Sequence, residues 1–444
     1  MEKARGKRRV TTFQIITAGF VALILIGTLL LMLPAASRQA GSVPFADCLF
    51  TATSAVCVTG LVVQNTATCW TGFGQAVILL LIQVGGMGVV TAAVSIAFLA
   101  GKRIGLFQRS VMQESIAAPQ VGGIVKLTRF IVLTSLSIEA IGAALMLPVF
   151  LPKFGPARGI WYAVFHSVSA FCNAGFDLMG TEIPFSSLTG YAHSVPVNLV
   201  LIALITVGGI GFLVWNDIKQ HGIHLKRYRL QSRIVLAVSA ILVLVPFLWF
   251  FFFEMPETPA SRRILPSLFQ SVTLRTAGFN TVDLDRMSGA GKAVMILWML
   301  VGGSPGSTAG GMKTTTVAML FLTAWAVFRR KNAVECLGRR ISDETARNAI
   351  AILTMYFVLF FTAGLLISRI ESLPLLTCLF ETASAVGTVG LTLGITSELG
   401  MISRGILVVL MFLGRVGGLT LIYAAQPVRP QTGSALPLEK ITVG

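Results

Sequence analysis

Four short segments of the sequence repeat one pattern, and no other feature restricts the possible folds as strongly. Each segment is apolar, and a phenylalanine in it is followed nine or ten residues later by a glycine. A glycine cluster comes 24 to 33 residues after that glycine. Repetition on this scale indicates four copies of one structural unit. The Phe–Gly pairs and the starts of the clusters are Phe50, Gly60 and Gly85; Phe165, Gly175 and Gly208; Phe269, Gly278 and Gly302; and Phe380, Gly390 and Gly414.

Longer apolar stretches flank these segments, and their length indicates a membrane. Eight stretches reach about 20 residues, which is enough for a helix to cross the bilayer core. The chain is 55% apolar and 12% charged, whereas a soluble domain is about 25% charged. This composition excludes a water-soluble globule, a disordered chain and a disulfide scaffold. We predict spans near residues 12–34, 72–100, 127–151, 194–215, 233–253, 290–328, 348–369 and 403–425.

Lysine and arginine are distributed unevenly over the predicted connections. The two tails and the even-numbered connections hold 22 of the 35, while the odd-numbered connections hold nine beside a similar number of acids. Because basic loops stay on the cytoplasmic side, both termini are expected in the cytoplasm of a multi-pass inner-membrane protein. The net charge of +17 then reflects topology and contact with anionic membrane lipids. No basic helix or interleaved aromatic pattern supports nucleic-acid binding.

The predicted fold is all-α and integral to the membrane. Each repeat is a helix, a re-entrant pore helix of 10–14 residues, a glycine-containing strand and a second helix, so eight transmembrane helices and four half-helices surround one pseudo-fourfold pore. The predicted divisions are a cytoplasmic tail 1–11, repeat 1 at 12–100, a loop at 101–126, repeat 2 at 127–215, a loop at 216–232, repeat 3 at 233–328, a loop at 329–347, repeat 4 at 348–425 and a tail 426–444.

The strand after each half-helix is the candidate ion site. A single glycine there has an ordinary reading as a turn or a packing residue, but four at one offset favour a shared role. Extended backbone at membrane depth has carbonyls that lipid cannot satisfy, and a dehydrated monovalent cation on the axis satisfies them. Thr388-Val389-Gly390-Leu391 nearly reproduces the T-V-G-Y of potassium-channel filters. The predicted potassium-binding backbone is Val58, Thr59, Gly60, Asn173, Ala174, Gly175, Thr276, Ala277, Gly278, Thr388, Val389 and Gly390.

One arginine lies in a column of glycines below the predicted filter. Arg415 aligns with the second glycine of the other three clusters, and Glu139 and Glu381 are the acids predicted at membrane depth. A fixed guanidinium there blocks cations or pairs with an acid, and we favour the block. The Gly/Pro-broken stretch 302–313 resembles the nucleotide-binding P-loop G-x-x-x-x-G-K-[ST]. It does not match, because Met312 separates the second glycine from the lysine. The predicted gate is Arg415 with Gly302, Gly303, Ser304, Pro305, Gly306, Ser307, Thr308, Ala309, Gly310, Gly311 and Lys313.

Two further charges lie beside the predicted filter. Arg275 precedes the third strand, and Glu381 is in the column of Thr51, His166 and Gln270. A buried unpaired charge is unfavourable, so we expect Arg275 to pair with Glu381 and to support the filter from behind. His166 is expected to be a hydrogen-bonded support.

The sequence resembles the TrkH/KtrB family of bacterial potassium transporters, and the KtrB branch in particular. The resemblance covers about residues 10–425. It implies a four-repeat pore, a homodimer, a cytosolic KtrA- or TrkA-type ring that binds the regulatory nucleotide, sodium as an activator, and a gate at the loop and the matching arginine. The chain departs from the family at Cys57, where threonine is commoner. The motifs are V-T-G-L at 58–61, N-A-G-F at 173–176, R-T-A-G-F-N at 275–280, G-G-S-P-G-S-T-A-G-G-M-K-T-T at 302–315, G-T-V-G-L at 387–391 and G-R-V-G-G-L-T at 414–420.

These features predict potassium uptake through a filter-containing pore that is gated from the cytoplasm. The alternative is an ion-coupled symporter of another monovalent cation, such as sodium or ammonium. A membrane enzyme is not expected, because the sequence offers no paired carboxylates, no Ser-His-Asp pattern and no H-E-x-x-H. Apart from the transported potassium, no metal is expected, since six scattered cysteines and four histidines form no zinc motif. A membrane scaffold would not need four filter-like strands.

Overall fold

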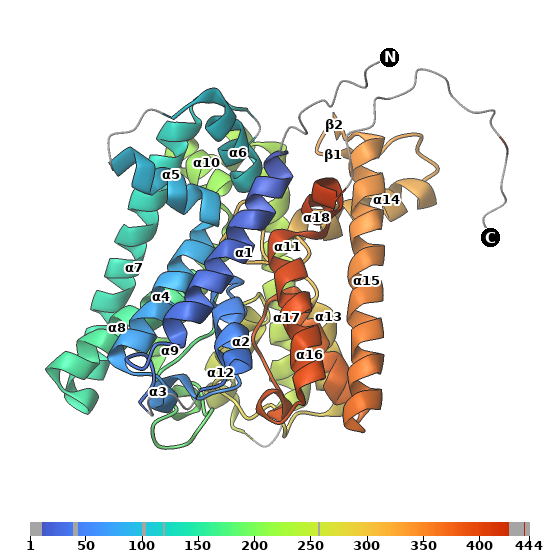
Figure 1. Ribbon diagram of the computed structural model, residues 1–444. Coiled ribbons are helices and arrows are strands. Elements are labelled where there is room, and N and C mark those ends of the chain that lie inside the picture. Colours follow the sequence, from blue (N-terminus) through green and yellow to red (C-terminus); the bar gives the residue numbers. More distant parts are fainter. Residues whose placement is uncertain are drawn as a thin grey trace, which may run out of the picture.

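The computed structural model describes residues 11–38, 43–99, 104–118, 120–255, 258–425 and 439. Most of these residues are helical, and α1, α7 and α15 run along the length of the molecule (Figure 1). The predicted tails 1–11 and 426–444 lie outside the described residues except for Thr11 and Glu439, and so do residues 101–103 and 119 of the first predicted loop.

Four long helices are apolar enough to cross a membrane. They match the predicted spans near 12–34, 127–151, 233–253 and 348–369. Their exposed surface is also apolar, as at Leu29 and Phe357, which suits contact with lipid. Ser342 caps the last one by accepting from the N–H of Thr345. They are α1 (Thr12–Leu31), α7 (Ile124–Phe154), α11 (Leu230–Trp249), which continues as the π-helical η3 (Phe250–Glu254), and α15 (Asp343–Glu371).

A shorter helix follows each long helix and packs against it. A proline begins each of the four, as the N-cap residue or the first helical residue, where its missing N–H has no helical partner to lose. The phenylalanine that marks each repeat is fully buried within it. The four helices are α2 (Phe45–Val56), α8 (Pro156–Phe171), α12 (Ala260–Thr273) and α16 (Leu375–Gly387).

The second apolar stretch of each repeat is broken. The breaks fall at Gly88, Gly211 and Gly417, all with positive φ, and at the irregular segment 300–313. We predicted an interruption only within 290–328, so the uninterrupted spans 72–100, 194–215 and 403–425 are corrected. A glycine with positive φ ends the helical hydrogen-bond series, and the bend at Gly211 reaches 95°. The broken pairs are α4 (Gly72–Met87) with α5 (Val89–Leu99), α9 (Val195–Ile210) with α10 (Phe212–His221), α13 (Gly289–Met299) with α14 (Thr314–Phe328), and α17 (Met401–Val416) with α18 (Gly418–Ala425).

The remaining short elements lie at the two ends of the molecule. We call the end with α6, α10 and the β1–β2 hairpin the connector end, and the end with α3 the loop end (Figure 1). These two names give directions within the molecule itself, because the structure contains no membrane. The short elements are α3 (Thr66–Cys69), α6 (Leu106–Ile116), η1 (Thr189–Tyr191), η2 (Leu225–Arg227), β1 (Glu335–Cys336), β2 (Arg339–Arg340) and η4 (Ile395–Ser397).

Candidate functional site

Each predicted filter strand has the same unusual backbone. Its first and third residues have positive φ, a conformation rarely adopted by valine or threonine. Such backbone persists where the surrounding structure imposes it, and it is concentrated at functional sites. Because the sign of φ alternates, successive carbonyls turn toward one side of the strand. The values are 50° and 93° at Val58 and Gly60, 56° and 69° at Asn173 and Gly175, 61° and 78° at Thr276 and Gly278, and 52° and 92° at Thr388 and Gly390.

The four strand glycines lie in a closed ring. A Cβ added to any of them would come within 2.9 Å of a carbonyl oxygen from the middle residue of another strand. The contacts run in repeat order and return to the first repeat. A side chain at these positions would therefore displace backbone oxygens, which explains glycine here beyond the requirement for positive φ. The glycines and the oxygens they meet are Gly60 with Ala174, Gly175 with Ala277, Gly278 with Val389, and Gly390 with Thr59.

A buried hydroxyl on each short helix holds the strand in place. Each one lies four residues after the repeat phenylalanine. The N–H groups of Gly60 and Gly390 donate to Ser54 and Ser384 at 3.1 and 3.0 Å. The hydroxyls of Ser169 and Thr273 donate instead to the carbonyls of Phe176 and Phe279. These four residues are not among the predicted site residues, although the F-x-x-x-[ST] pattern in every repeat is a visible signal.

The glycine clusters form a second level beside the strands. Segment 300–313 is held there mainly by backbone hydrogen bonds to the second and fourth clusters and to Phe212. The hydroxyl of Thr308 also donates to Asn173 Oδ1 at 3.1 Å, which links this segment to the second strand. The backbone bonds are Ser304 N to Gly209 O (3.0 Å), Thr308 N to Gly208 O (3.3 Å), Phe212 N to Gly306 O (2.7 Å) and Gly311 N to Gly414 O (3.1 Å).

Arg415 reaches from the fourth cluster to the first and to the predicted gating loop. Its guanidinium donates to the carbonyls of Gly85, Gly86 and Thr308, with 2.9 Å to Gly86. Lys313 donates to the carbonyl of Ala309 at 2.8 Å. Both cations line a cavity of 390 Å³ toward the connector end, together with Glu114 of α6. Arg415 thus bonds backbone carbonyls and no carboxylate among the described residues, so the structural-pairing alternative lacks its acid.

The predicted pair of Arg275 and Glu381 is wrong. Arg275 donates to the carbonyls of Ser239 and Gly302, both at 3.5 Å. Glu381 instead accepts from the hydroxyls of Thr392 and Thr396. The carboxylate therefore binds the chain just beyond its own strand, whereas Arg275 makes only two long bonds and its buried Nε has no partner among the described residues.

His166 binds the chain just beyond the second strand, as Glu381 binds the chain just beyond the fourth. Its Nε2 accepts from the N–H of Leu178 at 3.3 Å, just beyond the second strand. Nδ1 then carries the hydrogen and donates to the carbonyl of Tyr162 at 2.7 Å. This is a hydrogen-bonded support, as we expected.

The loop end has its own repeated polar position, ten residues before each glycine cluster. The side chain there donates to a carbonyl of the loop that leaves the strand, and it thereby fixes the loop to the helix that follows. The bonds are Gln75 to Trp70 O (3.3 Å), Asn198 to Tyr191 O (2.7 Å), Lys292 to Asp285 O (3.0 Å) and Arg404 to Ser397 O (2.8 Å).

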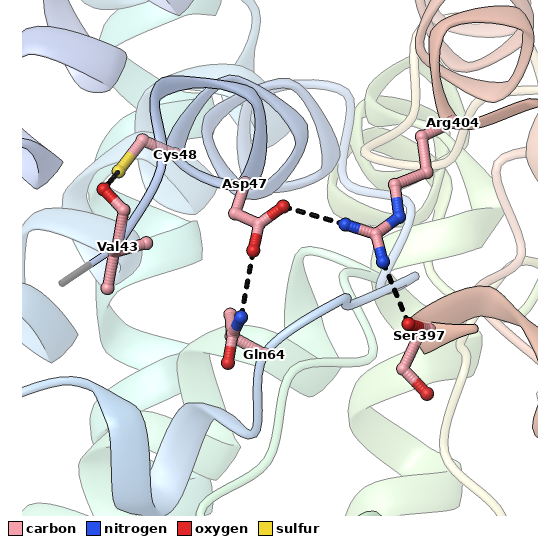
Figure 2. Close-up of polar contacts among 6 residues, drawn as sticks. All are labelled: Val43, Asp47, Cys48, Gln64, Ser397 and Arg404. Carbon is pink, nitrogen blue, oxygen red and sulfur yellow. Dashed lines mark hydrogen bonds and ion pairs between the residues drawn. The ribbon is translucent and has the colours of Figure 1, made fainter. Parts of the chain in front are cut away.

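Two of these four side chains also cross to the next repeat. Gln75 accepts from Trp161 Nε1 at 2.8 Å, and Arg404 donates to Asp47 Oδ1 at 2.8 Å. Figure 2 shows Asp47 between Arg404 on one side and Gln64, which follows the first strand, on the other. The seam between the last and first repeats is therefore closed by an ion pair.

Comparisons with known proteins agree on one family. The TrkH family, described as "Cation transport protein", matches residues 3–435. The potassium/sodium uptake protein NtpJ of Enterococcus hirae is 38% identical, over 100% of this chain and 99% of that protein. The Ktr system potassium uptake protein B of Bacillus subtilis is 37% identical, over 94% of this chain and 93% of that protein. The crystal structure of the potassium transporter TrkH from Vibrio parahaemolyticus matches with a TM-score of 0.73 at 20% identity, over 96% of this chain and 87% of that one.

Proposed function

Since this chain belongs to the TrkH family of cation transport proteins, we propose that it takes up potassium ions through a pore lined by its four glycine-containing strands. The observation that carries the proposal is the closed ring of Gly60, Gly175, Gly278 and Gly390, with a carbonyl oxygen of another strand beside each. Rings of backbone carbonyls replace the hydration shell of a potassium ion. Potassium is the transported substrate, and the ligands are backbone atoms.

The helices and the charge distribution support the following arrangement in the membrane. The chain is a multi-pass membrane protein, in which α2, α8, α12 and α16 are the half-helices of four tandem repeats around one pseudo-fourfold pore. The connector end faces the cytoplasm, because it holds the basic connections, including exposed Arg329, Arg330 and Lys331. The half-helices end beside the strands, so their C-terminal partial negative charge favours a cation there.

The gate lies on the cytoplasmic side of the filter. Arg415 and segment 302–313 stand between the strands and the 390 Å³ cavity. A fixed guanidinium repels a potassium ion strongly in a narrow, poorly screened space. Opening therefore requires Arg415 to release Thr308, and the backbone bonds from Gly306 and Gly311 to break or shift with it.

The names of the relatives support a partner protein. Two relatives, each named Ktr system potassium uptake protein B, match this chain over almost its full length, and the word system implies a further component. We propose a homodimer that docks a cytosolic KtrA- or TrkA-type ring on its connector end, with the regulatory nucleotide bound by the ring and sodium acting as an activator. Co-purification with a co-expressed ring protein in mild detergent tests the docking, and no association would overturn it.

Sodium or ammonium symport is the second candidate. Two observations favour looser selectivity: the relative in Enterococcus hirae is named a potassium/sodium uptake protein, and only the fourth strand reads T-V-G. A coupled symporter moves its substrate against a gradient when a second ion gradient is imposed, whereas a pore does not.

Flux of single cations in proteoliposomes tests the function. We expect potassium and rubidium flux that runs down its own gradient, with sodium and ammonium slower. Potassium-dependent growth of a bacterial strain without uptake systems is the test in cells. Equal flux of all alkali cations would contradict the filter, and flux that requires an imposed sodium or proton gradient would establish the symporter.

A further inference from the structure

We propose that a pocket at the loop end, between the first and second repeats, binds the phosphate group of an anionic phospholipid. The pocket has a volume of 690 Å³ and lies among α3, α4 and α8. None of its lining residues belongs to the glycine-containing strands or to the predicted gate. The proposal goes beyond ion conduction and uses only the proposed orientation, which places this end at the outer leaflet.

Two arginines from distant parts of the chain converge on this pocket. Arg38 comes from the segment after α1, and Arg158 from the first turn of α8. Arg38 donates one hydrogen bond at 3.4 Å, to the carbonyl of Ala67, and a guanidinium has five N–H donors. Among the described residues that line the pocket, none is acidic. The arginine donors therefore face a pocket that lacks a counter-charge of its own.

A tyrosine hydroxyl adds a third donor. Tyr162 also lines the pocket, and only 8% of its surface is exposed. Its ring packs on Phe154, yet its hydroxyl has no hydrogen-bond partner within the described part of the chain. This hydroxyl is therefore free to donate to a ligand in the pocket. Two guanidinium groups and a hydroxyl are the donors that a phosphate oxygen accepts.

The start of α4 completes the site. The first residue of this helix, Gly72, lines the pocket, and a Cβ added there would meet no atom within 4 Å. The hydroxyl of Thr71 already accepts from the N–H of Gly74, and the space beside Gly72 is open. The N-terminus of a helix of this length carries partial positive charge and favours an anion.

The neighbouring surface identifies the anion as a lipid. Phe73 and Ile160, next to the lining residues Gly72 and Trp161, are 45% and 50% exposed, so they offer apolar area to acyl chains. Trp161 and Tyr162 are the residue types found where the bilayer meets water. A free phosphate uses the donors and leaves this apolar surface in water. Because Trp161 also donates to Gln75, a bound lipid would stabilise the contact between the two repeats.

Lipid binding to the purified full chain tests the proposal. The protein is exchanged into phosphatidylcholine nanodiscs and titrated with phosphatidylglycerol, with bound lipid counted by native mass spectrometry after release. We expect at least tenfold weaker phosphatidylglycerol retention in Arg38→Gln/Arg158→Gln. The matched control is Arg262→Gln/Arg286→Gln, which removes the same charge from exposed arginines at the same end and should retain the lipid as wild type does.

Two further arms separate the alternatives. Tyr162→Phe keeps the ring and the charge. A several-fold loss of phosphatidylglycerol retention in this folded variant would assign the hydroxyl to the site, even if the double variant failed to fold. Millimolar inorganic phosphate should not displace the lipid. Displacement by phosphate would show a free-anion site, and equal retention of phosphatidylglycerol by both double variants, or no preference over phosphatidylcholine, would overturn the proposal.

Discussion

Arg404 Nη1 lies 2.8 Å from Asp47 Oδ1, and this ion pair joins the fourth repeat to the first. The other repeats are linked to their successors by the chain itself, whereas these two are linked only by contacts. Asp47 is nearly buried, and Arg404 is about a quarter exposed. The same carboxylate accepts from Gln64 at 2.8 Å, so the pair also holds the chain that leaves the first strand.

Breaking this pair should weaken both the ring and the filter. We expect Asp47→Asn and Arg404→Gln each to lower the free energy of unfolding by about 2 kcal/mol, less than for a fully buried pair because Arg404 keeps some water. The double variant should lose less free energy of unfolding than the two single variants lose together. Thermal unfolding in detergent and the potassium-to-sodium flux ratio measure the two effects. Additive losses would show that the side chains act independently.

Removing a strand-supporting hydroxyl should loosen the filter. Ser384→Ala leaves the buried N–H of Gly390 without an acceptor, which costs about 1–3 kcal/mol. We expect a lower potassium-to-sodium flux ratio and a lower melting temperature. Ser137→Ala is the matched control, since the hydroxyl of Ser137 is exposed and bonds only within its own helix. If both variants keep wild-type selectivity, the hydroxyl does not support the strand.

A side chain on a strand glycine should abolish selective uptake. Gly390 has φ of 92° and faces the carbonyl of Thr59, so Gly390→Ser strains the backbone and displaces that oxygen. We expect a large rise in the potassium concentration needed for half-maximal uptake. Gly405→Ser is the control, because a Cβ there meets no atom within 4 Å. Unchanged affinity and cation preference in Gly390→Ser would remove the strands from the ion site.

Removing the arginine should open the pore. Arg415→Ala removes the fixed charge and the bonds to Thr308, Gly85 and Gly86, so flux without the ring partner should rise several-fold. Arg369→Ala, an exposed arginine at the far end of α15, is the charge-matched control. Flux is measured per folded protein in proteoliposomes. A well-folded Arg415→Ala protein that conducts no better than wild type would be incompatible with the gate.

In the proposed orientation, which places the loop end outside the cell, uptake should depend on the external pH through Asp177, two residues beyond Gly175. Burial raises the pKa of this carboxyl to about 6, against hydrogen bonds from Met179 and Ser187 that lower it. Its negative charge is therefore present above pH 6 and lost below it. A carboxylate near the mouth concentrates cations, so uptake at limiting potassium should fall from pH 7 to pH 5.

The control for this pH dependence is a pair of variants. Asp177→Asn should give pH-independent uptake at the lower level, while Asp283→Asn, an exposed aspartate in another loop, should keep the wild-type profile. An unchanged pH profile in Asp177→Asn would assign the dependence to another group.

Features with a local cause were predictable from the sequence. A stretch of about 20 apolar residues is a membrane helix wherever it stands, which gave α1, α7, α11 and α15. A glycine at one offset in four copies signals a shared backbone requirement, and all four have positive φ. The match to the TrkH family confirms the resemblance, and the relatives' names confirm the expected potassium uptake.

The breaks in the second helices were less visible. Glycine inside an apolar stretch either packs against a neighbour or ends the helix, and the sequence is the same in both cases. Gly27 lies within α1 and packs beside Leu81 of α4, whereas Gly88 and Gly211 end their helices. Only the proline in segment 302–313 removed this ambiguity beforehand.

The sequence by itself determined the apolar spans, the four repeats and the glycine backbone of the strands, because each depends on residues close together in the chain. Only the tertiary structure decided which polar groups meet. Glu381 bonds Thr392 and Arg275 bonds main-chain carbonyls, where charge alone suggested that the two would pair. Asp47 and Arg404 meet across 357 positions. A buried charge takes whichever partners the packed helices bring within hydrogen-bonding distance, and that proximity is a property of the assembled ring.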